Sequence, residues 1–232
     1  MEAIILAGGL GTRLQGVIGT QPKCMATVND RPFLSWLFQY LVRQKCTRVI
    51  LSLGYKHDVI VDWVHEQNLP FPVDYVVESE PLGTGGGIQL ALLMAKEDDV
   101  VVLNGDTMFN LSLFEIFNFH KARGANTTLG LKVMHDFNRY GIVNTDEEGA
   151  ILSFEEKQPR DIGMINGGVY VINRPHFLAK NFAERFSFEK DYLEQYVTRE
   201  PIYGYCSSEY FIDIGVPEDY AQSQEDFKKL FA

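Results

Sequence analysis

The sequence predicts an α/β fold in which helices cover both faces of a mainly parallel sheet. The first half of the chain alternates short, wholly apolar segments with segments whose apolar residues recur at helical spacing. Strands that are apolar throughout are typical of parallel sheets that are buried on both faces. The chain has 232 residues, of which 46% are hydrophobic and 22% charged, and it can bury a core without disulfides or a structural metal.

The first half of the chain predicts strands and helices in alternation. Pro32 suits the first turn of a helix, and the apolar residues that follow it recur every three or four positions. Asp58 is suited to begin the next helix. We expect strands over residues 3–6, 49–51, 73–77 and 100–103, and helices over residues 32–42, 58–64 and 86–95.

After about residue 108 the pattern becomes less regular. A helix is expected over residues 111–123, with one side formed by Leu113, Phe114, Ile116, Phe117 and His120. Further strands are expected over residues 127–133, 142–144, 151–154, 168–172, 202–205 and 210–214. The last helix begins at Pro217 and ends near Lys229, with acidic residues first and lysines last, as the helix dipole favours. No linker divides the chain, so we expect one domain over residues 1–232.

Charge and cysteine content exclude several classes of function. The chain has 31 acidic and 21 basic residues, and its formal charge of −10 opposes binding to nucleic acid or to an anionic membrane. The three cysteines and five histidines are scattered and show no zinc-site spacing. The cysteines are therefore expected to be free thiols, and we expect a cytoplasmic protein without a signal peptide.

A glycine-rich turn, Gly8–Arg13, directly follows the first expected strand. Such a turn exposes successive backbone N–H groups and lets an anion approach them, although it could also be a tight turn without a ligand. A dinucleotide-binding turn is disfavoured, because Leu14 stands where a third small residue is needed and no acid ends the second strand. No Gly-Lys-Ser/Thr follows, so the turn is not a Walker-type phosphate loop.

The charge around this turn favours an anion site. Residues 3–29 contain no Asp or Glu, and their two basic residues are Arg13 and Lys23. A solvated basic face is the alternative, but two bases beside a glycine turn do not make such a face. The stretch therefore predicts a polyphosphate site.

Two carboxylates occur where apolar strands end or are interrupted. Asp106 lies just past the strand expected over residues 100–103, at the edge where open α/β sheets bind ligands, although it could instead cap a turn. Asp213 lies between Ile212 and Ile214, where an acid is costly unless it is paired or bound to a cation. Two carboxylates together with phosphate oxygens suit Mg²⁺.

The segment Ala7–Leu14, with Pro22 and Lys23, resembles the signature of sugar-1-phosphate nucleotidyltransferases. Further motifs of that family recur in order along the chain: Glu80–Gly86, Asn104–Asp106, Phe154–Lys157, Asn166–Tyr170 and Phe211–Tyr220. The resemblance implies a Rossmann-like nucleotidyltransferase fold with a mainly parallel mixed sheet flanked by helices. The chain is too short for the C-terminal β-helix of larger relatives. Residues 1–108 would form the nucleotide-binding part, and residues 109–232 the sugar-phosphate-binding part.

The resemblance implies that the glycine-rich turn holds a nucleoside triphosphate. Arg13 would hold the β- and γ-phosphates, and Lys23 would contact phosphates at the reacting centre. The loop Glu80–Gly86 resembles the base-recognition loop of mannose-1-phosphate guanylyltransferases. The carboxylate of Glu80 fits the two adjacent N–H donors of guanine, although a surface acid before a turn is the alternative. The implied nucleotide-binding residues are Leu6, Ala7, Gly8, Gly9, Gly11, Thr12, Arg13, Lys23, Glu80, Gly83 and Thr84.

The resemblance also assigns the metal and the acceptor site. Asp106 and Asp213 would ligate Mg²⁺, and Lys157 would neutralise the sugar phosphate. The implied sugar-phosphate-binding residues are Glu156, Lys157, Asn166 and Gly167. The sequence departs from the family pattern at Gln158, which separates Lys157 from the expected proline, and at Cys24, where the family has a small residue or a proline.

The expected reaction is attack by a sugar-1-phosphate oxygen on the α-phosphorus of a nucleoside triphosphate, with release of pyrophosphate. Its catalytic residues would be Arg13, Lys23, Asp106 and Asp213. The late motif is most similar to that of D-glycero-D-manno-heptose 1-phosphate guanylyltransferases, which favours GMP transfer from GTP to give GDP-heptose. The alternatives are guanylyl transfer to mannose 1-phosphate, uridylyl or cytidylyl transfer, a catalytically silent nucleotide-sugar sensor, and a nicotinamide-dependent oxidoreductase.

Overall fold

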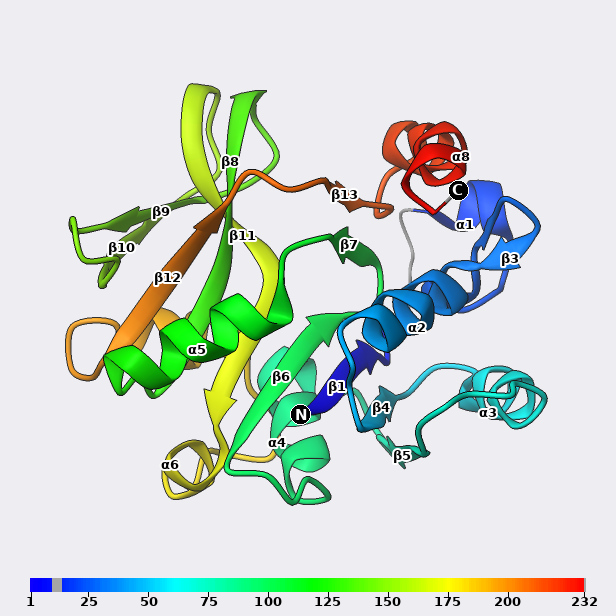
Figure 1. The fold of residues 1–232 in the computed structure, drawn as a ribbon, viewed down its shortest axis with the longest axis horizontal. Coiled ribbons are helices and arrows are strands. Elements are labelled where there is room, and N and C mark those ends of the chain that lie inside the picture. Colours follow the sequence, from blue (N-terminus) through cyan, green and yellow to red (C-terminus); the bar gives the residue numbers. More distant parts are fainter. Residues whose placement is uncertain (10–13, 232) are drawn as a thin grey trace.

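A seven-stranded sheet runs through the middle of the molecule (Figure 1). The computed structural model describes residues 1–9 and 14–231. Neighbouring strands follow the order β12-β8-β11-β6-β1-β4-β5. Their bounds are β1 (Glu2–Ala7), β4 (Arg48–Leu53), β5 (Val73–Val77), β6 (Asp99–Asn104), β8 (Thr127–Phe137), β11 (Arg160–Asn173) and β12 (Ile202–Ser207). Only β11 runs antiparallel to its neighbours in this sheet, which confirms the predicted mainly parallel mixed sheet.

Helices and short strands surround this sheet. The helices are α1 (Gln15–Ile18), α2 (Phe33–Arg43), α3 (His57–His65), α4 (Gly83–Leu92), α5 (Leu113–Arg123), α6 (Arg174–Leu178), α7 (Glu194–Tyr196) and α8 (Pro217–Leu230), with a 3₁₀-helix η2 (Lys23–Met25) and a π-helix η3 (Phe188–Leu193). The short strands are β2 (Thr27–Val28), β3 (Arg31–Pro32), β7 (Thr107–Phe109), β9 (Ile142–Thr145), β10 (Ile151–Glu155) and β13 (Phe211–Asp213). In the part of the chain that the structure describes, no helix has the length and apolar content needed to span a bilayer.

Both faces of the central strands are apolar because each face meets a helix. Successive side chains of a strand point to opposite faces. Ile5 of β1 belongs to the core that α2 covers, whereas Ile4 belongs to the core that α4 covers. Burying one such side chain contributes about 1.5–3 kcal/mol. This two-sided burial explains why the strands are apolar throughout.

The helix expected over residues 86–95 is present but begins and ends three residues earlier, at Gly83–Leu92. Its glycines are required because the helix packs closely against the segment at residues 184–186. A Cβ at Gly86 would lie 2.3 Å from the carbonyl oxygen of Glu184, and one at Gly85 would lie 2.3 Å from the ring of Phe186. Glycine disfavours a helix in the absence of such packing, so the sequence pattern placed the start too late.

Two other elements differ from their expected positions. The strand expected over residues 168–172 is the end of the 14-residue strand β11, whose register shifts between Asn166 and Tyr170. Helix α5 begins at Leu113, because the side chain of Ser112 caps it by accepting the N–H of Glu115. Phe114, expected on the packed side of this helix, is 66% exposed.

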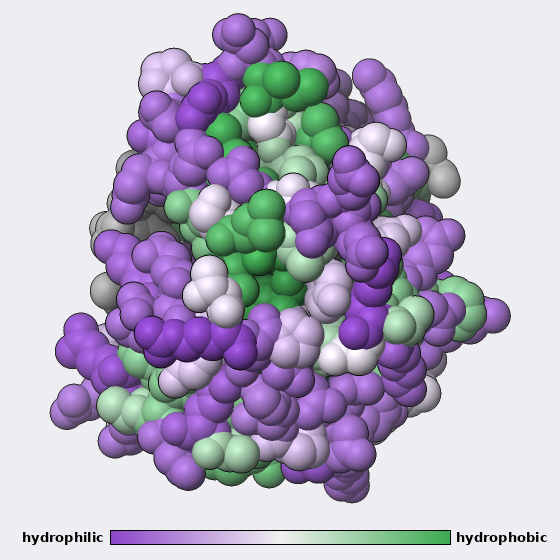
Figure 2. Space-filling view, turned by 90° about the vertical axis from the view of Figure 1, so that its left-hand side faces the viewer, coloured by the Kyte–Doolittle hydropathy of each residue, from purple (hydrophilic) through white to green (hydrophobic). Residues whose placement is uncertain are grey.

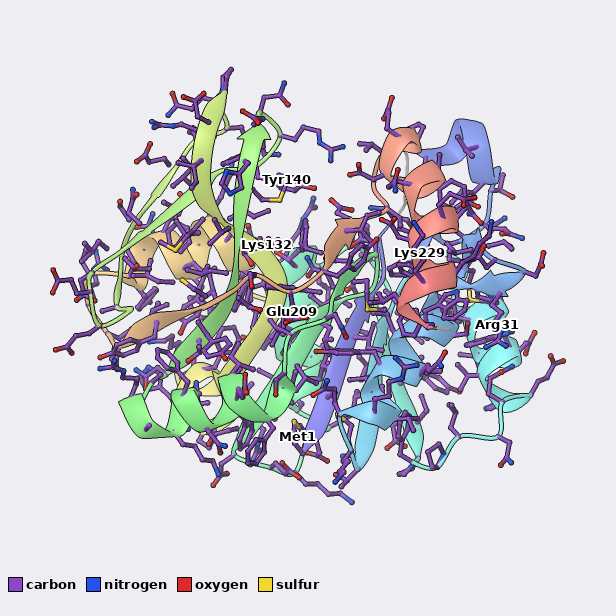
Figure 3. The ribbon with its side chains drawn as sticks, turned by 45° about the horizontal axis from the view of Figure 1, so that its top comes forward. Met1, Arg31, Lys132, Tyr140, Glu209 and Lys229 are labelled. Carbon is purple, nitrogen blue, oxygen red and sulfur yellow. The ribbon has the colours of Figure 1, made fainter. Side chains whose placement is uncertain are left out.

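A short strand pair brings distant segments together at the carboxyl edge of the sheet. Strand β13 runs antiparallel to β7 and places Asp213 opposite Thr107. The ammonium of Lys132 on β8 donates to the carbonyl oxygens of Ser208 and Glu209 at 2.6 and 2.7 Å, and Figure 3 shows Lys132 close to Glu209. These bonds fix the path of the chain from β12 to β13. As a result, the motif that begins at Phe211 lies close to the end of β6.

The side of the molecule that carries β9, β10 and β12 has an apolar hollow with a polar rim (Figure 2). Leu152 of β10 and Ile162 of β11 are exposed large apolar side chains of the strands in this half of the molecule. The cavity lined by polar side chains lies elsewhere, at the carboxyl edge of β6.

Candidate active site

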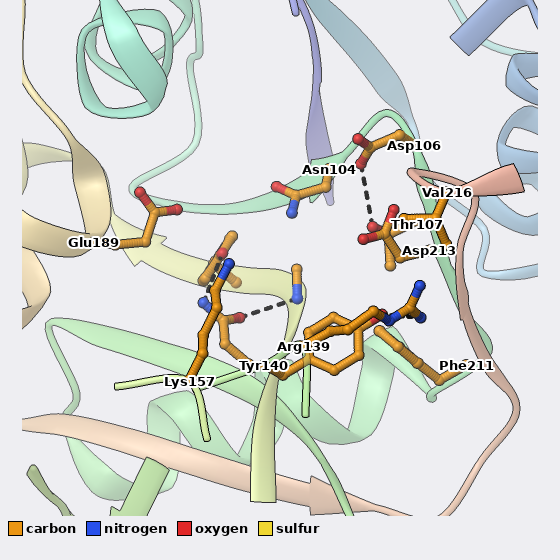
Figure 4. Close-up of a pocket in the computed structure, with 14 residues that line it drawn as sticks. Asn104, Asp106, Thr107, Arg139, Tyr140, Lys157, Glu189, Phe211, Asp213 and Val216 are labelled. Carbon is orange, nitrogen blue, oxygen red and sulfur yellow. Dashed lines mark hydrogen bonds between the residues drawn. The ribbon is translucent and has the colours of Figure 1, made fainter. Parts of the chain in front are cut away.

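A cavity of about 380 Å³ lies at the carboxyl edge of β6, beside the register shift of β11 (Figure 4). Its walls come from the end of β6, from β7, from the segment between β8 and β9, from the π-helix η3 and from β13. Open α/β sheets bind their ligands at this edge, because the chain leaves the strands there and loops supply side chains and backbone groups. The cavity is therefore the candidate active site.

Three residues from separate parts of the sequence meet beside this cavity, and two of them, Asp106 and Asp213, line it. Lys23 stands in η2, Asp106 follows β6 and Asp213 ends β13. The Lys23 ammonium donates to Asp106 Oδ2 at 2.5 Å and to Asp213 Oδ1 at 3.4 Å. The backbone N–H of Gly215 donates to Asp213 Oδ1 at 2.7 Å. The structure thus brings together three of the four expected catalytic residues.

The two carboxylates share a half-buried environment that favours a cation. Burial raises the pKa of Asp213, and the negative charge of Asp106 raises it further. The Lys23 ammonium and the Gly215 N–H act in the opposite direction but do not cancel this rise. Each carboxylate therefore gains from positive charge placed between them.

A divalent cation fits this pair of carboxylates. Asp106 and Asp213 already direct oxygen atoms at one ammonium, so their oxygens converge on a cationic centre. Within residues 1–9 and 14–231, no group of three or more His, Cys, Asp or Glu side chains is arranged to hold a metal. Magnesium commonly takes one or two carboxylates and completes its shell with phosphate oxygens and water. The donor set therefore suits a metal that arrives with phosphates.

Cys24, one of the departures from the family pattern, packs beside this cluster. Its side chain is buried. Burial raises the pKa of the Cys24 thiol to about 12, and the charge of Asp106 adds to the rise. The thiol stays protonated near neutral pH, which excludes a thiolate nucleophile at this position.

The expected sugar-phosphate residues are divided by the structure. Lys157, Asn166 and Gly167 line the cavity, whereas Glu156 is exposed and lies outside its lining. The side-chain amide of Asn166 forms hydrogen bonds within β11. It donates to the Tyr170 hydroxyl at 2.9 Å and accepts from the Gly168 N–H at 3.0 Å. Asn166 therefore shapes the wall of the cavity.

Arg139 and Tyr140 also line the cavity, although no motif in the sequence indicates them. Arg139 forms an ion pair with Asp219 at the start of α8, which joins the segment between β8 and β9 to the opposite side of the site. Burial raises the pKa of Tyr140 to about 12, and the charge of Asp213 contributes, so its hydroxyl stays neutral at pH 7. The segment has neither helical nor strand periodicity, so no pattern indicated it.

The nucleotide-binding residues expected at the first strand lie at the same edge of the sheet. Those that the structure describes are Leu6, Ala7, Gly8 and Gly9; Gly11, Thr12 and Arg13 lie outside the described residues. The N–H of Gly105 donates to the carbonyl oxygen of Leu6 at 2.9 Å, which joins the end of β1 to the turn that carries Asp106. A Cβ at Gly54 would lie 2.9 Å from the carbonyl oxygen of Gly8, so β1 and β4 end in close contact.

The expected base-recognition residues lie at the start of α4. Glu80 is exposed. Gly83 has a φ of +75°, and a Cβ there would lie 2.5 Å from the carbonyl oxygen of Phe186, so this position requires glycine. The Thr84 hydroxyl donates to Glu189 Oε2 at 2.7 Å, which links this loop to a wall of the cavity.

Glu78, which no motif of the sequence singles out, lies between Gly8 and Gly87 of α4. Its Oε1 would be 3.3 Å from a Cβ at Gly8 and 2.7 Å from one at Gly87. Its Oε2 accepts the N–H of Leu82 at 3.0 Å, and burial raises the pKa of the Glu78 carboxyl. In the sequence, the feature that could have indicated Glu78 is its position two residues before Glu80.

Comparisons with known proteins agree with the motifs. A model of the nucleotidyl transferase family matches residues 2–229. The chain is 44% identical to a D-glycero-alpha-D-manno-heptose 1-phosphate guanylyltransferase of Aneurinibacillus thermoaerophilus, over 98% of this chain and 99% of that protein. It is 33% identical to a mannose-1-phosphate guanylyltransferase of Mycobacterium tuberculosis, over 100% of this chain and 66% of that protein. The crystal structure of HddC from Yersinia pseudotuberculosis complexed with GMP-PN superposes with a TM-score of 0.87, at 36% identity over 97% of this chain and 99% of that chain.

Proposed function

The chain belongs to the nucleotidyl transferase family, and on that premise we propose that it transfers GMP from GTP to D-glycero-α-D-manno-heptose 1-phosphate. The products are GDP-heptose and pyrophosphate. The observation that carries the proposal is the convergence of the Lys23 ammonium on Asp106 and Asp213, two aspartates that line one cavity together with Lys157. The similarity to a heptose 1-phosphate guanylyltransferase over nearly the whole of both chains supports the choice of acceptor.

The nucleophile in this reaction needs no catalytic base. A phosphate monoester has a second pKa of about 6, so a sugar 1-phosphate already carries an anionic oxygen at pH 7. That oxygen forms a bond to the α-phosphorus of GTP, the bond from the α-phosphorus to the bridging oxygen breaks, and pyrophosphate leaves with the electron pair. Catalysis then depends on alignment of the reactants and on neutralisation of charge.

The chain's own cations supply that neutralisation. Lys23 donates to the oxygens of the α-phosphate as negative charge develops there, and Arg13 binds the departing β- and γ-phosphates. Lys157 neutralises the sugar phosphate from the opposite wall of the cavity. Asp106 and Asp213 would hold Mg²⁺, which would supply positive charge to the phosphate oxygens.

Base selection is assigned to the loop at the start of α4. The exposed carboxylate of Glu80 accepts the N–H donors of guanine, while Gly83 and Thr84 shape the adjoining backbone. Leu6, Ala7, Gly8, Gly9, Gly11 and Thr12 complete the nucleotide site. The proposal places the enzyme in the cytoplasm, where thiols such as the three free cysteines stay reduced.

A pyrophosphate-release assay tests the proposed reaction. The four nucleoside triphosphates are crossed with heptose, mannose and glucose 1-phosphates, each with and without Mg²⁺. The proposal predicts the highest kcat/KM for GTP with the heptose, and loss of turnover without the metal. A preference for mannose 1-phosphate or for UTP or CTP would replace the substrate pair, and binding of GDP-heptose without any turnover would indicate a sensor.

A further inference from the structure

Within the described residues, the motifs leave few free hydrogen-bond acceptors for sugar hydroxyls at the sugar end of the cavity. Glu156 is exposed and lies outside the lining. Asn166 lines the cavity, but both ends of its amide are bonded within β11, to Tyr170 and to Gly168. A sugar has several hydroxyl groups that lose their water when they are enclosed, so this end of the cavity needs another acceptor.

Glu189 supplies an acceptor on this wall. It lies in the π-helix η3 and lines the cavity, and Figure 4 shows its carboxylate on the wall away from Asp106 and Asp213. Its Oε2 accepts hydrogen bonds from the Thr84 hydroxyl at 2.7 Å and from the Ser187 hydroxyl at 3.1 Å. Within the described residues, no hydrogen bond reaches Oε1, so this oxygen is free to accept from a ligand.

The segment that carries Glu189 is held rigidly. A π-helix is rare and is frequently found at functional sites. Phe188 and Tyr192 of this helix are buried, and the ring of Phe188 packs edge-on against Tyr170 at 5.0 Å. The backbone N–H of Phe188 donates to the Thr84 hydroxyl at 3.0 Å. The same hydroxyl thus fixes both the start of η3 and the carboxylate of Glu189.

The surroundings of the Glu189 carboxylate favour a hydrogen bond from an uncharged hydroxyl group of a ligand. Its partners within the described residues are hydroxyl groups, and no ion pair neutralises its charge. An unneutralised carboxylate repels a phosphate, whereas it forms strong hydrogen bonds with O–H donors. The phosphate of a sugar 1-phosphate therefore suits the part of the cavity between the two aspartates and Lys157, and its hydroxyls suit the wall that carries Glu189.

We propose that Glu189, positioned by Thr84 and Ser187, accepts a hydrogen bond from a ring or side-chain hydroxyl of the acceptor sugar and so determines which sugar 1-phosphate is used. This inference rests on the proposed function, because it names a contact within the same reaction. It also gives Thr84 a second role: the loop assigned to the base and the residue that recognises the sugar are joined by one hydrogen bond.

Kinetics of Glu189→Ala and Glu189→Gln test this role, with Glu194→Gln as the matched control. Glu194 is an exposed acid five positions along the same segment. Loss of a hydrogen bond to a charged group predicts a KM for the sugar 1-phosphate that rises about 10- to 100-fold in Glu189→Ala and less in Glu189→Gln. The KM for GTP stays within about threefold, and Glu194→Gln matches the wild type.

A panel of monodeoxy mannose 1-phosphates distinguishes direct contact from a structural role. The wild type should lose about 10-fold or more in kcat/KM with the analogue that lacks the contacted hydroxyl, and Glu189→Ala should show no such loss with that analogue. An unchanged sugar KM in Glu189→Ala, or equal penalties for every analogue in both enzymes, would overturn the inference. Wild-type turnover with the unmodified sugars tests the proposed function separately; if it is absent, both proposals fail. Circular dichroism of each variant verifies folding. If the alanine variant is unfolded, the same comparison is made with Glu189→Gln.

Discussion

Lys23 holds together two carboxylates that would otherwise repel each other. Its ammonium reaches Asp106 and Asp213, and the Lys23 side chain is 12% exposed, so water screens its charge less than it screens a surface lysine. Such a cation is ready to interact with phosphate oxygens as their negative charge increases during the reaction. The residue therefore combines a structural and a chemical role, which its variants should separate.

Replacing Lys23 with alanine should reduce kcat by about 10²–10³, the usual cost of removing a group whose interaction strengthens in the transition state. Turnover is measured by pyrophosphate release, and folding by circular dichroism. Lys228→Ala is the control, because Lys228 is 58% exposed and pairs on the surface with Glu225. Turnover close to that of the wild type in Lys23→Ala would refute the catalytic role.

Glu80→Gln should raise the KM for GTP about 10-fold, because the amide replaces one of the two acceptor oxygens with a donor. The KM values for ATP, UTP and CTP should not rise. Glu78→Gln is measured beside it, since the Glu78 carboxylate accepts the Leu82 N–H and lies against Gly8 and Gly87. An effect on GTP in Glu78→Gln but not in Glu80→Gln would move the guanine contact to Glu78.

Among the elements, β11 is the one whose irregularity shapes the site. Its register shift between Asn166 and Tyr170 turns Asn166 and Gly167 toward the cavity. Gly168 within the shift has a φ of +69°, and a Cβ there would lie 2.6 Å from Asn104 Nδ2. Glycine at this position therefore allows the strand to deviate without displacing Asn104.

Gly168→Ala should lower the free energy of unfolding by about 1–3 kcal/mol, through backbone strain and the contact with Asn104. Chemical denaturation measures the change. Gly124→Ala is the matched control, because Gly124 also has a positive φ, +56°, but a Cβ there meets nothing within 4 Å. The Gly168 variant should be less stable than the control and should also lose activity; equal losses in stability would show that strain alone matters.

The sequence predicted elements well where burial decided them, and less well where tertiary contacts did. The apolar central strands were located correctly to within one or two residues, because their two-sided burial requires that pattern. The predicted bounds of helix α4 were three residues too late, because its glycines are explained by packing against residues 184–186. The pairing of β7 with β13 and the π-helix η3 were missed, because neither leaves a periodic signal in the sequence.

The same limit applies to the candidate site. Lys23, Asp106 and Asp213 could be proposed because each stands in an unusual local context, and the structure brings them together. Arg139, Tyr140 and other residues of the cavity stand in ordinary contexts and are recognisable only from the fold. The resemblance to sugar-1-phosphate nucleotidyltransferases is confirmed by the family match, which covers residues 2–229.

Away from the active site, a buried network of charged side chains around Glu200 makes the stability of the protein depend on pH. Glu200 Oε2 accepts hydrogen bonds from His176 at 2.8 Å and from Lys180 at 2.5 Å. Burial raises the pKa of Glu200, but the hydrogen bonds from Lys180 and His176 and the positive charge of Lys180 act in the opposite direction, and the net pKa is lowered. A lowered pKa in the folded state means that the ionised carboxylate stabilises the fold.

This stabilisation should be complete above the unfolded-state pKa of about 4.3 and should be lost as the pH falls through the lower folded-state pKa. Glu200→Gln should therefore have a lower Tm than the wild type at pH 6–7, and the difference should shrink between pH 5 and pH 3. Thermal melts followed by circular dichroism provide both values. A Tm difference that stays constant over this range would mean that ionisation of Glu200 contributes nothing.

A crystal structure of the enzyme with GDP-heptose and Mg²⁺ bound would show where the phosphates, the metal and the sugar lie. We predict the diphosphate between Lys23 and Lys157, the metal against Asp106 and Asp213, and the heptose toward Glu189. Phosphates bound in a different part of the molecule, with Lys23 still paired only to its two aspartates, would contradict this prediction.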